Sequence, residues 1–109
     1  MINVSMYRSQ GHLSGFEISG HAESGPYGYD LVCAAVSAVS FGAVNAIISL
    51  CDIEPVITQG GEGGYLQVKL PLHLEQEALI NARLLLEGML VSLQSIENEY
   101  HEYIKITNM

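Results

Sequence analysis

Cationic side chains are scarce in this chain. Of its 109 residues only four are Lys or Arg, against twelve Asp or Glu, so the formal net charge is −8. The four cations are spread along the sequence without forming a cluster: Arg8, Lys69, Arg83 and Lys105. Binding to phosphates needs clustered cations, so we expect neither a nucleic acid nor an anionic membrane as a direct partner. A basic protein partner would be favoured by charge.

Motifs for metals and phosphates are also missing. The sequence has no HExxH motif, no Cys/His cluster and no paired-carboxylate pattern, which leaves a metal site without support. The Gly-rich segment GGEGG (60–64) lacks the Lys-Ser/Thr that follows it in a phosphate-binding loop, and we interpret it as a hairpin turn. We therefore predict no cofactor and no metal.

The chain has only two cysteines, Cys33 and Cys51, and no CxxC pair. Both fall in one predicted helix, where a rise of 1.5 Å per residue places them about 27 Å apart, too far for a disulfide. The N-terminus also lacks the basic region and apolar run of a signal peptide. These features predict a reducing, cytoplasmic location.

Hydrophobic residues make up 49% of the chain, enough for the core of one compact domain over residues 1–109. Alternating and helical periodicities predict an α+β fold of order ββαββαβ, a mostly antiparallel sheet with two helices. The segment 20–29, rich in Gly and Pro, is predicted to be a loop. The predicted strands cover 2–8, 15–19, 55–59, 65–70 and 103–107, and the helices cover 30–51 and 74–99.

The first predicted helix carries no charge over residues 31–50, and an apolar stretch of this length can also span a membrane. Four polar residues interrupt it and acidic residues, not basic ones, flank it, which argues against that interpretation. A helix buried between its own sheet and a second copy of the chain explains the same composition. We therefore expect no membrane partner and a homodimer, which would also help so small a domain to bury apolar surface.

Cys33 is the candidate nucleophile. If Asp30 caps the helix, Cys33 is its third residue, close to unpaired amides that favour a thiolate and could stabilise an oxyanion. His21, directly after the second strand, could be folded back onto Cys33 as a base by the Gly- and Pro-bearing segment. Cysteine is also among the most often buried residue types, so a core role for Cys33 stays open at this point. Cys51, at the other end of the helix, is predicted to be a core residue.

Two serines, Ser37 and Ser40, follow Cys33 on the same face of the predicted helix. They could line the site, although serines commonly bond back to their own helix. The histidines 12, 73 and 101 fall in turns or near the ends of elements, without the spacing of metal ligands. We predict that these three lie on the surface.

The segment GHAESGPYGYDLVCAAVS (20–37) closely resembles the ribosomal-processing cysteine protease family, called Prp. That family's pattern is GHA, a short Gly-containing loop, and then G-x-D, two hydrophobic residues, C-A-x-x-S. The similarity continues through residues 41–47 and 89–100 and covers nearly the whole chain. The positions that match the pattern are Gly20, His21, Ala22, Gly28, Asp30, Cys33, Ala34 and Ser37.

The resemblance implies a homodimeric α+β protease with a His–Cys dyad, in which Cys33 is the nucleophile and His21 the base. Gly20, Asp30 and Ser37 are then supporting or substrate-site candidates. It also implies a substrate: a large-subunit ribosomal protein of the L-twenty-seven type, from which a short N-terminal extension is removed. Two alternatives remain at this stage, a non-enzymatic module that binds a ribosomal protein during assembly and another thiol-dependent enzyme.

Overall fold

The computed structural model describes residues 1–20, 26–60 and 64–108. Its elements follow the predicted order ββαββαβ, and most predicted ends lie within three residues of the observed ones. The elements are β1 (Ile2–Ser9), β2 (His12–Gly20), α1 (Pro26–Cys51), β3 (Val56–Gln59), β4 (Tyr65–Lys69), α2 (Gln76–Glu99) and β5 (Ile104–Asn108).

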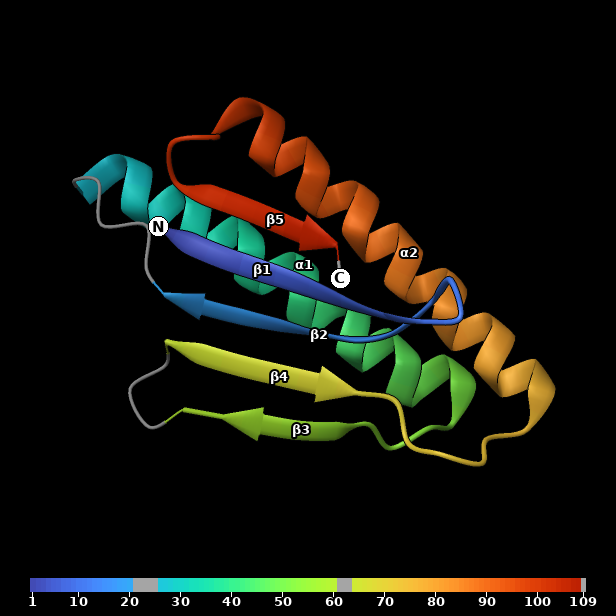
Figure 1. The fold of residues 1–109 in the computed structure, drawn as a ribbon. Helices are drawn as coiled ribbons and strands as arrows, with labels where there is room; N and C mark the ends of the chain where they lie inside the picture. The colour runs from blue at the N-terminus through green and yellow to red at the C-terminus, as the bar shows by residue number, and fades with distance from the viewer. Residues whose placement is uncertain (21–25, 61–63, 109) are drawn as a thin grey trace.

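The five strands form one sheet in the order β3-β4-β2-β1-β5 (Figure 1). The pairs β3–β4, β4–β2 and β2–β1 are antiparallel, whereas β1 and β5 are parallel. The predicted mostly antiparallel sheet is therefore confirmed. β1 and β2 are joined by a two-residue turn at Gln10 and Gly11, both with positive φ, as in the type I′ turns that match the twist of a hairpin.

Both helices cover one face of this sheet, and α1 passes behind β1 and β2 in Figure 1. Side chains alternate along the strands, so that Ile2, Val4 and Met6 of β1 are buried while the residues between them face the other side. The largest fully buried side chain is Phe16 of β2. The helices add to the same core with Val32, Val36, Val44, Ile47, Ala82, Leu86, Met89, Leu90 and Leu93.

The core accounts for one side of each helix only. Several large apolar side chains of α1 and α2 are exposed, among them Leu31, Ile48 and Leu84. Both helices are also long and apolar enough to cross a membrane, a property that core helices of soluble proteins share. In this chain the apolar residues of α1 are thus divided between the core and an outward face.

The start of α1 differs from the prediction. The helix begins at Pro26, so Asp30 is not its N-cap, and residues 26–29 are helical and not part of a loop. Proline is favoured in the first helical turn because its φ is already helical and an N–H in that turn has no partner within the helix. The Gly and Pro of this segment, interpreted as loop signals, therefore belong in part to a helix start. The predicted loop residues 21–25 lie outside the described residues.

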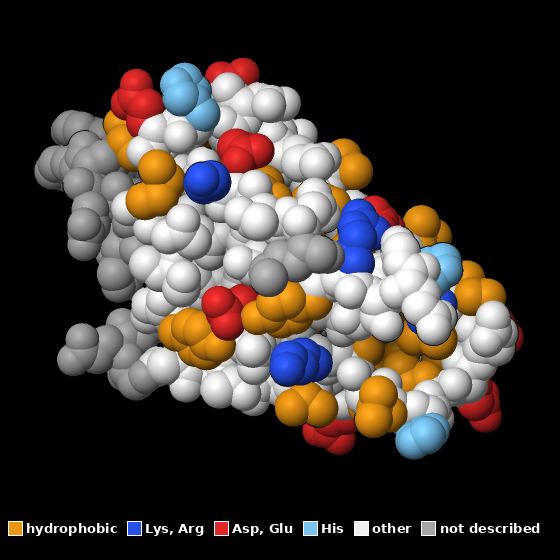
Figure 2. All heavy atoms as spheres, viewed as in Figure 1, with side chains coloured by type: hydrophobic (Ala, Val, Ile, Leu, Met, Phe, Trp, Pro, Cys, Tyr) orange, Lys and Arg blue, Asp and Glu red, His pale blue; other side chains and the backbone are white. Residues whose placement is uncertain are grey.

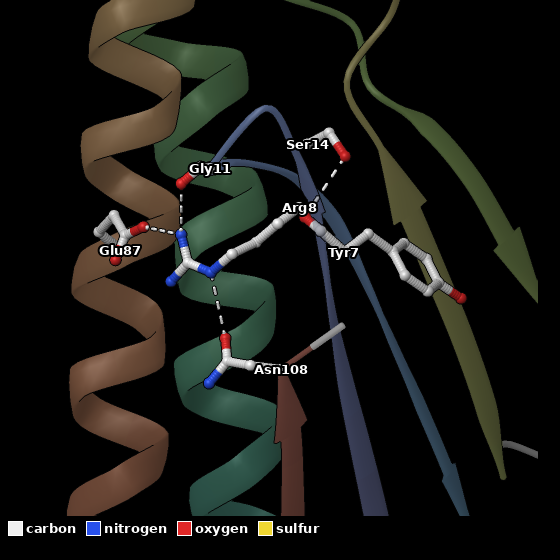
Figure 3. Close-up of polar contacts among 6 residues, drawn as sticks. All are labelled: Tyr7, Arg8, Gly11, Ser14, Glu87 and Asn108. Atoms are coloured by element: carbon white, nitrogen blue, oxygen red, sulfur yellow. Dashed lines mark hydrogen bonds and ion pairs between the residues drawn. The ribbon is translucent and has the colours of Figure 1, made fainter.

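Arg8 of β1 connects three other parts of the fold (Figure 3). Its guanidinium donates to Glu87 Oε1 of α2 at 2.8 Å, to the Gly11 carbonyl at 3.0 Å and to Asn108 Oδ1 of β5 at 3.3 Å. The hairpin turn, the second helix and the last strand thus meet at one side chain. A charged group with several acceptors is held more firmly than one in a single surface ion pair.

Among the described residues, no layer covers the sheet face opposite the helices. Figure 2 shows this face, where hydrophobic, acidic and basic side chains are interspersed. Its central feature is the carboxylate of Glu17, whose Oε2 accepts hydrogen bonds from the hydroxyls of Tyr7 at 3.0 Å and Tyr65 at 2.8 Å. Gln67 in turn donates to the Tyr7 hydroxyl at 3.3 Å.

Candidate active site

A cleft of about 500 Å³ opens at the end of the sheet where β1 begins, β2 ends and β4 begins. One wall is α1, and the other is formed by the strands and the two ends of the β3–β4 connection. The cleft is lined by Ile2, Ile18, Gly20, Cys33, Val36, Ser37, Ser40, Phe41, Gln59, Gly60, Gly64, Tyr65 and Leu66. Most of these side chains are apolar or small, and this composition suits an uncharged stretch of peptide better than an ion.

Cys33 lies in the α1 wall of the cleft as a free, half-buried cysteine. It touches the core on one side and the cleft on the other. The prediction that it lies in the first turn of the helix is wrong, because Cys33 is the eighth residue of α1, with Pro26 as the first. Its own amide therefore belongs to the helical hydrogen-bond ladder and is not an unpaired donor for an oxyanion. The placement in the cleft, not the helix end, makes Cys33 chemically accessible.

Gly20 lines the same cleft from the end of β2. Its φ is +88°, and a Cβ at this position would lie 2.4 Å from the Met1 carbonyl oxygen. Only glycine fits both the conformation and the close approach. The following residue, His21, lies outside the described residues, so the predicted base is placed by sequence alone.

The two serines predicted to follow Cys33 along one face both line the cleft. Together with Cys33 and Phe41 they occupy positions i, i+4, i+7 and i+8 of α1, which form one stripe on a helix. Ser40 is buried and its hydroxyl donates to the Val36 carbonyl at 2.7 Å. Ser40 therefore lines the site and also bonds back to its own helix, while Ser37 is exposed toward solvent.

Cys51 and the three other histidines are not among the described residues that line the cleft. Cys51 ends α1 as expected and packs against the core. The three remaining histidines, at positions 12, 73 and 101, are exposed as predicted. Asp30 is a residue of α1, and its side chain lies outside the described part of the structure. Among the described residues no group of three or more His, Cys, Asp or Glu side chains could hold a metal ion.

The sequence did not point to the wall opposite Cys33. Gln59, Gly60, Gly64 and Tyr65 come from the β3–β4 hairpin, which was interpreted only as two strands and a turn. They reach the site because β4 pairs with β2, so that Tyr65 lies opposite Ser19, one residue before Gly20. A signal was present in the glycines on either side of the turn, since glycine often marks a close approach of backbone to another group.

Comparison with known proteins shows which family this chain belongs to. The family model of the cysteine protease Prp matches residues 1–105. The chain belongs to the cysteine protease Prp family. The ribosomal processing cysteine protease Prp of Bacillus subtilis (strain 168) is 48% identical over 109 residues, covering 98% of this chain and 96% of the relative.

Two crystal structures of the essential ribosomal processing protease Prp from S. aureus share the fold over 100% of both chains. The complex with a covalently linked product peptide is 41% identical with a TM-score of 0.86. The complex with a substrate peptide is 39% identical with a TM-score of 0.85. Membership of the Prp family makes this chain a cysteine protease, and of its two cysteines only Cys33 lines the cleft. The Prp motif residues Gly20, Cys33 and Ser37 meet there.

Proposed function

We propose that this Prp protein removes a short N-terminal extension from a large-subunit ribosomal protein of the L-twenty-seven type. The observation that carries the proposal is the position of Cys33, in a largely apolar cleft formed by α1 and the sheet. Relatives that are 48% and 42% identical carry the name ribosomal processing cysteine protease. The formal net charge of −8 also suits the capture of a basic ribosomal protein.

The reaction assigns one role to each member of a His21–Cys33 pair. His21 takes the proton of the Cys33 thiol, and the sulfur attacks the carbonyl carbon of the scissile peptide bond. The C–N bond breaks as His21 returns the proton to the leaving amine, which leaves the acyl group on sulfur. Water, deprotonated by His21, then hydrolyses this thioester and restores the thiol. Gly20, which is bonded to His21, lines the cleft with Cys33, and this supports the pairing.

The supporting positions have distinct tasks in this proposal. Gly20 carries the chain from β2 to His21 in a conformation open to glycine alone. Ser37 is one helical turn beyond Cys33 in the same cleft wall and contributes a hydroxyl to the bound peptide. Asp30 precedes Cys33 in α1, as the Prp motif requires. No cofactor takes part.

We also propose that the protein acts in the cytoplasm as a homodimer. The two cysteines are free, which suits a reducing compartment. For the dimer, the support is the outward face of α1, where Leu31 and Ile48 are exposed by 54% and 44%. Large apolar side chains that a helix leaves exposed outside the core favour a second copy over water.

Cleavage of a synthetic peptide tests the activity and the nucleophile. The peptide carries the N-terminal residues of the host's ribosomal protein, including its extension, and the products are identified by mass spectrometry. We expect Cys33→Ala to abolish cleavage, whereas Cys51→Ala, on the same helix but outside the cleft, retains it. An assembly module would bind the peptide without cutting it, and an acyl-transferring enzyme would require a second acceptor.

Variants of histidine test the base. His21→Ala should lose most of the rate and slow the labelling of Cys33 by iodoacetamide near neutral pH. His12→Ala is the matched control, because His12 is exposed at the far end of β2. Three outcomes would contradict the proposed pair. They are cleavage by Cys33→Ala, labelling of Cys51 before Cys33, and equal cleavage rates for the two histidine variants.

A further inference from the structure

The sheet has two edge strands, β5 and β3, which differ in how their outer main-chain groups are paired. At the β5 edge, the Ile106 N–H donates a hydrogen bond to Glu97 Oε2 of α2 at 2.8 Å. At the β3 edge, no described element lies beyond the strand (Figure 1). An edge strand whose donors and acceptors are free is a template for pairing with another extended chain.

The register of β3 shows which of its main-chain groups are free. The Gly60 N–H donates to the Tyr65 carbonyl at 3.0 Å, and alternate residues of an antiparallel pair exchange such bonds. Thr58, two residues earlier, is therefore also bonded to β4. The N–H and C=O groups of Ile57 and Gln59 point away from β4, and they have no hydrogen-bond partner among the described residues.

The side chains of β3 lack the features that commonly protect an edge. Its sequence VITQ contains no charged residue, whereas lysine and other charges prevent edge pairing in many proteins. Val56 and Ile57 are 57% and 44% exposed. Ile57 lies opposite the buried Val68 and so faces the helix side of the sheet, where a side chain of an added strand would pack beside it.

The location of the free groups favours the substrate as the added strand. The last residue of β3, Gln59, lines the cleft together with Cys33. At the other end, the residue before β3 is the buried Pro55, which has no N–H to donate. The open part of the edge therefore lies next to the cleft and ends away from it. A peptide that is extended for cleavage has the conformation that pairs with a sheet edge.

We propose that β3 binds the substrate by β-strand addition, in which the main chain of the peptide pairs with Ile57 and Gln59 where it enters the cleft. The inference rests on the proposed function, since it takes a substrate peptide as the occupant of the cleft. The hydrogen bonds are made by main-chain atoms on both sides. This docking therefore adds affinity for an extended peptide without selecting among its side chains.

Amide hydrogen exchange measured by NMR tests the pairing directly. The protein is Cys33→Ala, so that a synthetic peptide with the N-terminal residues of the host's ribosomal protein, including its extension, is not cut. Saturation with this peptide should slow the exchange of the Ile57 and Gln59 amides about tenfold or more. The Ile106 amide, at the other edge, should be unchanged. Unchanged exchange at Ile57 and Gln59 would overturn the inference, while cleavage of the same peptide by the wild-type protein still decides the proposed function.

Proline at position 57 removes one free donor and keeps the ladder, because the Ile57 N–H points away from β4. Ile57→Ala is the matched control, since it also loses the isoleucine side chain but keeps the N–H. In the Cys33→Ala background, Ile57→Pro should bind the peptide about fivefold more weakly than Ile57→Ala, the factor for one net hydrogen bond. Thermal unfolding verifies that both variants are folded. Equal Kd values for the two would contradict the inference.

Changes in the peptide main chain test the pairing without a variant of β3. Each peptide of a series carries one N-methyl group, which removes a single N–H and leaves every side chain in place. Binding to Cys33→Ala should weaken at every second position, because only alternate amides of an added strand face β3. A loss without this alternation would refute strand addition. Light scattering identifies a competing occupant: if Ile57→Pro converts a dimer into monomers, the β3 edge pairs with a second copy and the proposal is wrong.

Discussion

Gly20 lines the candidate active site in a backbone conformation that favours glycine. It combines a φ of +88° with a clash of any Cβ against the Met1 carbonyl oxygen at 2.4 Å. Gly20→Ala should therefore lower the free energy of unfolding by about 2 kcal/mol, the cost of a left-handed conformation plus local displacement. Peptide cleavage should fall as well, because the displaced residue lines the cleft. Urea unfolding followed by circular dichroism measures the first effect.

A helical glycine provides the control for this substitution. Gly42 lies inside α1, and a Cβ there would meet nothing within 4 Å. Gly42→Ala should raise the free energy of unfolding by up to about 1 kcal/mol, since alanine is the better helix former. Equal effects of the two substitutions would contradict the assigned role of Gly20.

Residues close in sequence were the predictable part of the site. Gly20, Cys33 and Ser37 belong to one motif and line one cleft, as expected. Tyr65 could not be assigned in this way, because its place depends on the pairing of β4 with β2. Alternation within a strand shows which residues share a face, but it does not specify which strand lies beside it.

At the scale of the elements, an ion pair between Arg8 of β1 and Glu87 links α2 to the sheet. The ion pair with Glu87 at 2.8 Å joins β1 to α2, and its side chains are 27% and 43% exposed. Solvent screening keeps such a pair weak, so we expect a coupling free energy of about 0.5 kcal/mol between Arg8→Met and Glu87→Gln. The single Arg8→Met variant should cost about 1 kcal/mol, because two further hydrogen bonds are lost.

A double-mutant cycle in thermal unfolding measures this coupling. Because the pair is partly exposed, the coupling should decrease at high salt. Lys105→Met is a suitable control, since Lys105 is exposed on β5 and forms no ion pair among the described residues. A cost of Arg8→Met no larger than that of the Lys105 control would show that this contact does not hold α2 to the sheet.

Element types were easier to predict than the start of α1. The order ββαββαβ follows from periodicity and was confirmed. Pro26 and Gly28 carry the signals of a loop and of a helix start at the same time, and the two can be told apart only when the following turns are in place. This ambiguity placed Cys33 in the first turn by prediction and in a later turn in the structure, away from the unpaired amides expected near its sulfur.

For the whole molecule, the open question is what covers the outward face of α1. Only one side of this helix contributes to the core, while Leu31 and Ile48 remain exposed. In a symmetric dimer each interface residue occurs twice, so a single charged substitution buries two charges without partners. Ile48→Glu should therefore convert a homodimer into monomers, and Ile48 is suitable for this test because it lies outside the cleft.

Light scattering at micromolar concentration measures the outcome. The wild-type protein should have about twice the 11.8 kDa mass of one chain, and Ile48→Glu should have the mass of one chain. Leu72→Glu is the matched control, because Leu72 is 83% exposed and belongs to the connection between β4 and α2, not to α1. It adds the same charge and should leave the dimer intact. A monomeric wild-type protein would refute the proposed dimer, and a dimeric Ile48→Glu would show that this face of α1 is not the interface. Dissociation by both substitutions would attribute the effect to net charge and not to this face of α1.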